Sequence, residues 1–167
     1  GGGVDGPATR TGNGEGGEVE ARGAGSAVLQ IATRFDRPFV VRDRAPLNGV
    51  PGQPEMRRGV SKTVRRAWSG ASVLTTLAAG ASAALSAPTG PVSVELPIDV
   101  QREHALVPRV WPKPRTARVT PDAAAIDCLA DMLARARRPM FSFGGGARGA
   151  TPQAADPVRR GIAAVSI

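Results

Sequence analysis

The stretch that decides the fold is SVLTTLAAGASAALSAPTGPVSVEL, residues 72–96. Its first part predicts a helix over 73–87, because small and apolar residues recur there at helical spacing and share one stripe. Ser72 is suited to cap the start of this helix, and Pro88 stops it. The alternating segment Val-Ser-Val-Glu-Leu over 92–96 then predicts a strand. A helix followed closely by a strand is typical of a parallel α/β sheet.

The segment upstream adds a second strand to this sheet. Residues 26–32, with the sequence SAVLQIA, form a short apolar run that predicts a buried strand. A loop rich in proline and glycine follows over 34–54. Residues 55–67 predict a short helix, because apolar residues recur there every four positions. The order of these elements predicts one α/β domain over residues 24–101.

A linker is predicted over residues 102–120. Several prolines and charged residues favour an extended and exposed path there. Domain boundaries fall in such segments. We therefore expect a second domain to begin at residue 121.

Residues 121–167 predict another set of α/β elements. Thr120, Pro121 and Asp122 suit the start of a helix, as cap, first residue and dipole partner. Its apolar stripe is predicted to be buried. The later elements are a strand over 139–143, a glycine loop, a weak helix over 151–160 and a strand over 161–167. Each sheet needs more strands than this sequence supplies. The predicted fold class is α/β, with parts of two incomplete three-layer parallel-sheet domains joined by a proline-rich linker.

The first 23 residues differ from the rest in composition. They are rich in glycine and polar residues and have no apolar periodicity. Glycine has a high conformational entropy cost in a helix or strand. Residues 1–23 are therefore predicted to be disordered.

The composition also limits the function classes. The formal net charge is +8, but the arginines are scattered in singles and pairs, and aromatic residues make up only 4%. An Arg-rich solvated surface therefore explains the charge better than a nucleic-acid interface does. The single cysteine, Cys128, excludes an internal disulfide and predicts a small packed side chain. There is no run of about 18 apolar residues and no basic-then-apolar leader, so we expect a cytoplasmic protein without membrane contact.

Three stretches together resemble one enzyme family. Residues 90–100 (GPVSVELPIDV) are similar to the closing strand of the pyrimidine-binding domain in thiamine-diphosphate-dependent enzymes. Residues 136–147 look like the opening of that family's central domain, whose first strand runs into a Gly-Gly-Gly turn. Residues 24–31 resemble an earlier strand of the first domain, and 60–62 (Val-Ser-Lys) resemble the start of a family helix. The order matches as well, and the resemblance, covering roughly 12–167, is to the acetolactate synthase type.

The resemblance implies both an activity and an assembly. Residues 24–101 would be the C-terminal part of the pyrimidine-binding domain, and 121–167 the start of the central domain. The full-length family uses thiamine diphosphate and Mg²⁺ to act on 2-oxo acids, as a carboligase or decarboxylase, and works as a homodimer or tetramer. The family's cofactor-activating glutamate and its Gly-Asp-Gly metal motif have no counterpart in this sequence. We therefore predict no catalytic or metal-binding residue here, no tight cofactor binding, and no activity of this chain alone.

The glycine run Gly144, Gly145 and Gly146, followed by Arg148, is the candidate cofactor-binding segment. A strand that ends in glycines lets backbone amides approach a nucleotide phosphate. The resemblance implies flavin adenine dinucleotide for this segment, since acetolactate-synthase-like members bind it in the central domain, although many relatives bind nothing there. Alternatively, the glycines only make a tight turn. The full G-x-G-x-x-G spacing is missing, which favours the second interpretation.

Other readings of the residues and of the function remain open. Glu95 alternates with apolar neighbours and is predicted to face a polar side or a partner subunit. Asp99 is predicted to set the turn after the strand. Trp68 and Trp111 are predicted to be packing residues.

A truncated, non-catalytic remnant or interaction module is the alternative to an enzyme fragment, and a basic nucleic-acid binder is the third hypothesis.

Overall fold

The computed structural model describes residues 2–5, 9–42, 53–116, 120–160 and 163–166. The chain divides into two compact units, Gly1–Ala117 and Arg118–Ile167. The division lies inside the segment predicted as a linker.

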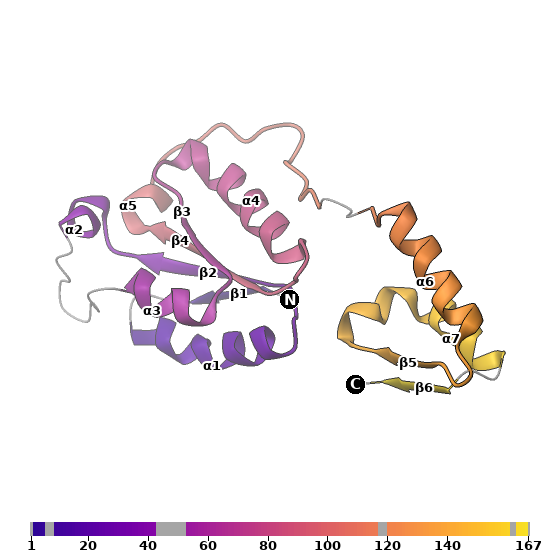
Figure 1. The fold of residues 1–167 in the computed structure, drawn as a ribbon. Coiled ribbons are helices and arrows are strands. Elements are labelled where there is room, and N and C mark those ends of the chain that lie inside the picture. Colours follow the sequence, from indigo (N-terminus) through magenta and orange to yellow (C-terminus); the bar gives the residue numbers. More distant parts are fainter. Residues whose placement is uncertain (1, 6–8, 43–52, 117–119, 161–162, 167) are drawn as a thin grey trace. The chain divides into compact units, whose positions relative to one another are not determined.

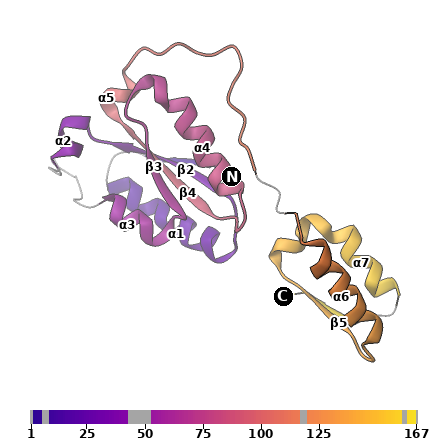
Figure 2. The ribbon, with the colours of Figure 1, turned by 45° about the horizontal axis from the view of Figure 1, so that its top comes forward.

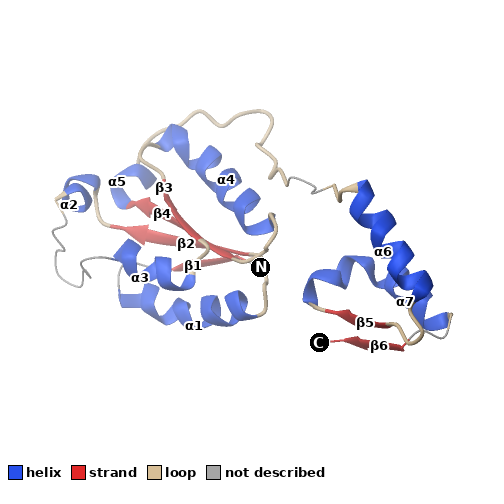
Figure 3. Ribbon diagram, in the orientation of Figure 1, coloured by secondary structure: helices blue, strands red, loops and turns tan. Residues whose placement is uncertain are grey.

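Unit 1 is built on a four-stranded parallel sheet with the order β1-β2-β4-β3. Its strands are β1 (Gly2–Asp5), β2 (Val28–Arg34), β3 (Thr63–Arg66) and β4 (Pro91–Pro97). Its helices are α1 (Thr9–Gly23), α2 (Arg37–Val41), α3 (Gln53–Val60), the 3-10 turn η1 (Gly70–Ser72), α4 (Val73–Leu85) and α5 (Ile98–Gln101). Helix α4 covers one face of the sheet, and α1 and α3 cover the other (Figures 1 and 3). The predicted α/β class with a parallel three-layer arrangement is therefore confirmed for this unit.

Helix α4 packs against the sheet through a glycine. An added Cβ at Gly80 would lie 2.9 Å from Val94 Cγ2 and 3.0 Å from Leu29 Cδ1. Any larger residue would hold the helix away from β2 and β4. The centre of this layer is aliphatic, with Val92 and Val94 fully buried. The predicted helix over 73–87 and strand over 92–96 are confirmed, with the strand extended to Pro91–Pro97.

The prediction that residues 1–23 are disordered is wrong for the parts that β1 and α1 cover, Gly2–Asp5 and Thr9–Gly23. Three backbone bonds close the helix in a Schellman motif, Ala24 N to Glu20 O, Gly25 N to Arg22 O and Ser26 N to Ala21 O, with Gly25 at φ +61°. Only glycine adopts this conformation without strain. The helix also buries Glu18 and Ala21. Each glycine in a helix costs about 1 kcal/mol relative to alanine. Tertiary contacts thus offset this cost in α1.

The predicted helix over 55–67 is also wrong in its second half. Helix α3 ends at Val60, and Thr63–Arg66 form strand β3, which pairs with β4 in parallel register. The helical spacing of Val64 gave a misleading signal, because an edge strand is stabilised by its neighbour and not by its own periodicity. The predicted loop over 34–54 contains α2, while residues 43–52 lie outside the described part of the chain.

Unit 2 contains a two-stranded parallel sheet, β5 and β6. Its elements are α6 (Ala123–Arg135), β5 (Met140–Phe143), the 3-10 segment η2 (Gly145–Ala150), α7 (Thr151–Arg159) and β6 (Ala163–Ser166). The parallel α/β class is confirmed here too. Asp122, and not Thr120, caps α6, with its side chain accepting a bond from Ala124 N at 3.4 Å.

The predicted burial of the α6 stripe is wrong in this structure. Ile126 and Leu129 are both 50% exposed, and Met132 is exposed too. Cys128, predicted to pack as a small hydrophobe, is exposed as well. The cause is the small sheet, since two strands offer too little surface to cover a helix of 13 residues.

Candidate functional site

The predicted cofactor-binding glycines lie on an open turn. Gly144 follows β5, and Gly145 and Gly146 begin η2, where all three are exposed. Ala147 N donates to Gly144 O at 2.9 Å. An added Cβ at any of the three would meet nothing within 4 Å. Arg148 lies in η2, and its side chain is outside the described part of the structure. The turn leaves its backbone accessible without forming a closed cradle, so phosphate binding there stays a prediction.

A buried polar cluster lies between the sheet and helices α1 and α3. Strand alternation places Gln30 of β2 and Ser93 of β4 on this face of the sheet, in register with each other. Glu18 reaches them from α1, Arg57 from α3, and Ser61 from the turn after α3. All five residues are at most 4% exposed. The opposite face of the same strands is apolar and contacts α4, so the two faces of the sheet differ in chemistry.

Hydrogen bonds connect this cluster closely. Arg57 Nη1 donates to Gln30 Oε1 and, at 3.0 Å, to Ser93 Oγ, and it lies 3.8 Å from Glu18 Oε1. Ser61 Oγ donates to Glu18 Oε2 at 2.9 Å, and Ser93 Oγ donates to Glu18 Oε1 at the same distance. The Nε and Nη2 atoms of Arg57 are buried without a hydrogen-bond partner in the described chain. The cluster has a balanced charge but is not fully satisfied, and it has no exposed member that could meet a substrate.

A second charged group lies near the carboxyl end of β4. Arg37 Nε donates to Asp99 Oδ2 at 2.6 Å, and Arg37 Nη2 donates to Glu103 Oε1 at 2.5 Å. Glu103 Oε2 accepts from Gly70 N at 2.6 Å, and Trp68 O accepts from Arg37 Nη1 at 2.8 Å. This arginine therefore joins α2, α5, the turn before α4 and the chain that follows α5.

The protonation of Asp99 reflects two opposing causes. Partial burial works to raise the pKa of its carboxyl group, but the hydrogen bonds and positive charge of Arg37 outweigh it, so the pKa lies below its ordinary value. The hydrogen bond to Asp99 in turn raises the pKa of Arg37. The turn predicted for Asp99 is present, since Arg102 N donates to Asp99 O at 3.2 Å. Its side chain also anchors Arg37, which the sequence alone did not indicate.

Glu95 is fully buried and has an arginine partner. Its Oε2 accepts from Arg66 Nε at 2.8 Å and from Arg66 Nη2 at 2.5 Å, while its Oε1 has no hydrogen-bond partner in the described chain. Arg66 also lies over the ring of Trp68, at 5.1 Å from the centroid. Glu95 thus faces a polar side, as one of the two predicted alternatives had it. Trp68, predicted to be a packing residue, is half-exposed, and the guanidinium of Arg66 packs on its ring.

A large pocket lies between α4 and the segment that follows α5. We call residues 103–115 the strap, because they run the length of α4 from one end to the other (Figures 1 and 2). The pocket between them has a volume of about 910 Å³ and is lined mainly by apolar residues, among them Leu74, Val100, Val107 and Trp111. Trp111, also predicted to be a packing residue, lines this pocket and is 60% exposed.

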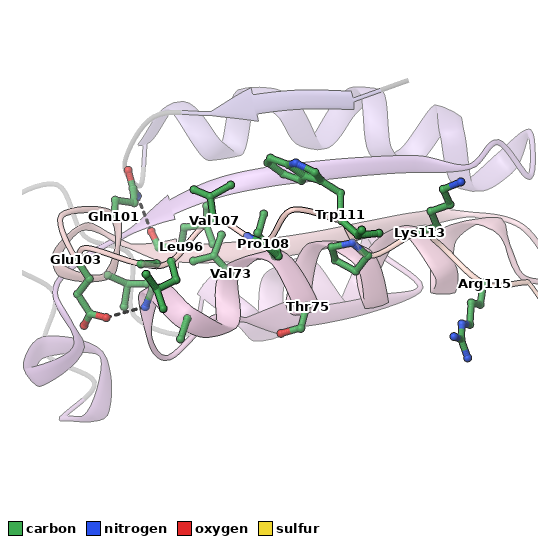
Figure 4. A pocket seen from close by; sticks show the side chains of 18 residues that line it. Val73, Thr75, Leu96, Gln101, Glu103, Val107, Pro108, Trp111, Lys113 and Arg115 are labelled. Carbon is green, nitrogen blue, oxygen red and sulfur yellow. Dashed lines mark hydrogen bonds between the residues drawn. The ribbon is translucent and has the colours of Figure 1, made fainter.

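The two ends of the pocket differ in charge. Figure 4 shows Gln101 and Glu103 at one end, where Gln101 Nε2 donates to Leu96 O at 2.8 Å and Glu103 accepts from Gly70 N. Lys113 and Arg115 lie at the other end. Neither cation has an acidic partner in the described part of the chain.

The described residues contain no group of three or more His, Cys, Asp or Glu side chains that could hold a metal ion. No helix in the described ranges is both long and apolar enough to cross a membrane. The polar groups identified above serve mainly to hold unit 1 together. The pocket under the strap is the feature whose chemistry suits binding.

The buried polar cluster around Arg57 and the contacts of Arg37 could not be predicted from the sequence. A signal was present in the strands, because Gln30, Arg34, Ser93 and Glu95 alternate with apolar residues. Such alternation normally indicates a solvated face. Only the packing of α1 and α3 shows that this face is covered.

Comparison with known proteins supports the fold. No match was found among protein-family models or among curated proteins. Among solved structures, the chain is similar to the X-ray structure of a candidate thiamin diphosphate-dependent enzyme isolated from Mycobacterium smegmatis, with a TM-score of 0.70 and 23% sequence identity. The similarity covers 98% of this chain and 31% of that one. The chain thus has the fold of about a third of that larger protein.

Proposed function

We propose that this chain is part of a thiamine-diphosphate-dependent enzyme that acts on 2-oxo acids, of the acetolactate synthase type. The observation that carries the proposal is the fold similarity, which extends over nearly the whole chain and both of its units. The three sequence stretches at 24–31, 90–100 and 136–147 occur in the family's order and support the same assignment. The reaction would be carboligation or decarboxylation, in the cytoplasm, by a homodimer or tetramer.

The cofactor would be held mainly by other parts of the enzyme. Thiamine diphosphate supplies a carbanion equivalent that attacks 2-oxo acids, while the protein supplies position and electrostatics. The described residues offer no cluster that fits the Mg²⁺ ion of its diphosphate. In this proposal, unit 1 supplies the scaffold of the pyrimidine-binding domain, with Arg37 and Asp99 fixing the end of its sheet. Gly144, Gly145 and Gly146, with Arg148, are the residues that would approach a flavin phosphate.

The test uses the native protein. An antibody raised against the α6 segment, residues 123–135, captures the polypeptide from its source cells, and free peptide releases it. We expect a protein larger than 17.1 kDa that contains thiamine diphosphate and Mg²⁺ in stoichiometric amounts and forms acetolactate from pyruvate. A captured protein without bound thiamine diphosphate would contradict the proposal.

The isolated chain provides the matched control. We expect the 167-residue protein, supplied with thiamine diphosphate, Mg²⁺ and pyruvate, to give no turnover, because it offers no described metal cluster. Turnover by this chain alone would mean that the cofactor is held here and not elsewhere. Flavin content of the captured protein separately tests the glycine turn.

A further inference from the structure

The pocket under the strap has a simple geometric origin. The strap is anchored at one end by Glu103, which accepts from Gly70 N, and at the other by Arg115, whose N donates to Ser82 Oγ at 2.8 Å. The helical path between the two anchor points on the α4 side is about 18 Å, at 1.5 Å per residue. The strap has the same number of residues but is rich in proline, and an extended chain of that length spans about 37 Å. The strap therefore has excess length and bows away from α4, which leaves a hollow.

The two walls of this hollow are apolar. Leu74 and Val73 project from α4, and Val107, Val110 and Trp111 come from the strap. Val107 and Val110 are largely exposed. When an apolar ligand displaces water from apolar side chains that face an open pocket, the free energy of the system falls, which favours binding. The volume of about 910 Å³ lies within the usual range of small-molecule sites.

The charges at the ends define which headgroup fits. Both carboxylate oxygens of Glu103 are already occupied, one by Arg37 and the other by Gly70 N. This end therefore offers little to a ligand. Lys113 and Arg115 at the opposite end have no acidic partner in the described residues. Their side chains point in different directions in Figure 4, so an anion at this end would pair with one of the two cations.

We propose that the pocket between α4 and the strap binds an amphipathic anion, with an apolar body between Leu74 and Trp111 and a single acidic headgroup paired with one of the two cations at this end, Lys113 or Arg115. This site lies wholly within unit 1 and is independent of the thiamine diphosphate proposal. Binding would tie the strap to α4 and so fix the path of the chain that leaves the domain.

The test measures two fluorescent probes on the full 167-residue chain. 8-Anilinonaphthalene-1-sulfonate carries an apolar body and an anionic group, and N-phenyl-1-naphthylamine has a closely similar body without the charge. We expect saturable binding of the sulfonate at one site, tighter than that of the neutral probe. The double variant K113E/R115E should weaken sulfonate binding about tenfold and leave the neutral probe within about twofold.

Two further variants make the outcome decisive. Thr75→Trp places a large side chain from the exposed side of α4 into the pocket and should weaken both probes. Arg109→Glu changes the charge of the strap at a residue that does not line the pocket, and should leave both unchanged. Retention of both probes by Thr75→Trp would place binding elsewhere, for example on the exposed apolar face of α6, and would overturn the proposal. An effect of Arg109→Glu as large as that of the double variant K113E/R115E would overturn the headgroup assignment.

Discussion

Arg57 shows how one buried charge can decide the stability of a layer. It is 0% exposed and lies between α3 and the sheet, with Glu18, Gln30 and Ser93 around it. A buried ion pair contributes little compared with an apolar pair of the same shape, but loss of one partner leaves an uncompensated charge. Arg58, its neighbour in sequence, is 64% exposed at the side chain and pairs only with Glu55.

The first prediction compares these neighbours. Arg57→Met should lower the free energy of unfolding of unit 1 by about 3–5 kcal/mol, and Arg58→Met should change it by no more than about 0.5 kcal/mol. Both tryptophans, Trp68 and Trp111, lie in unit 1, so tryptophan fluorescence in a urea titration follows this unit alone. If Arg57→Met does not fold, the double variant with Glu18→Gln should recover part of the loss. Equal effects of the two single variants would contradict the role assigned to Arg57.

Asp99 gives a pH dependence whose sign is fixed by its environment. Its pKa in the folded state lies below the ordinary value of about 3.8. A lowered pKa contributes stability that is fully present above the unfolded value and is lost as the pH falls through the folded value. The bonds from Arg37 should therefore stabilise unit 1 at neutral pH and fail in acid.

The second prediction follows from this. Asp99→Asn should lower the thermal midpoint of unit 1 at pH 7, and the difference from the wild type should shrink as the pH falls below about 4. Glu55→Gln, which removes the exposed pair with Arg58, should leave the thermal midpoint unchanged both at pH 7 and below about pH 4. The measurement is a thermal melt followed by tryptophan fluorescence across the pH range. A difference that stays constant down to low pH would show that Asp99 does not act through its charge.

At the scale of elements, the position of α4 depends on a glycine, Gly80, at the point where the helix packs on the sheet. Without a Cβ at this position, the helix backbone lies so close to Val94 and Leu29 that an added methyl group would lie 2.9 and 3.0 Å from their side chains. Gly59, in the last turn of α3, has nothing within 4 Å of an added Cβ. Close packing of α4 on the sheet therefore requires a glycine at position 80, whereas packing does not require one at position 59.

The third prediction uses this pair. Gly59→Ala should stabilise unit 1 by about 0.5–1 kcal/mol, because alanine has the better helix propensity. Gly80→Ala gains the same propensity, but it crowds the core at a cost of about 1–3 kcal/mol, so its net effect should be destabilising. Urea midpoints from tryptophan fluorescence measure both. Stabilisation by Gly80→Ala would mean that α4 can shift away from the sheet at little cost.

At the scale of the whole molecule, the two units differ in how far they bury their apolar surface. Unit 1 has a four-stranded sheet covered on both faces, and its core residues, such as Val92 and Val94, are fully buried. Unit 2 has two strands, and Ile126 and Leu129 are half-exposed on α6. Two strands seldom form a stable sheet by themselves.

The fourth prediction separates the units. Residues 1–117 expressed alone should unfold cooperatively in urea, with the same tryptophan midpoint as the full chain. Residues 118–167 alone should show a weak far-ultraviolet dichroism signal and a broad, non-cooperative melt. A sigmoidal transition of 118–167 would show that the small unit is stable without further strands, and would favour the interaction-module alternative.

The sequence by itself determined the α/β class, the helix at α4, and strands β2, β4 and β5, because apolar spacing and proline punctuation are local signals. It also placed the unit division, Ala117 to Arg118, within a predicted linker. Only the tertiary structure decided three other features. Helix α1 forms despite its glycines because Glu18 gains buried partners, Thr63–Arg66 become a strand because β4 pairs with them, and the pocket exists because a long strap is fixed at both ends of a shorter helix. Each of these depends on contacts between residues far apart in the chain, which no local pattern records.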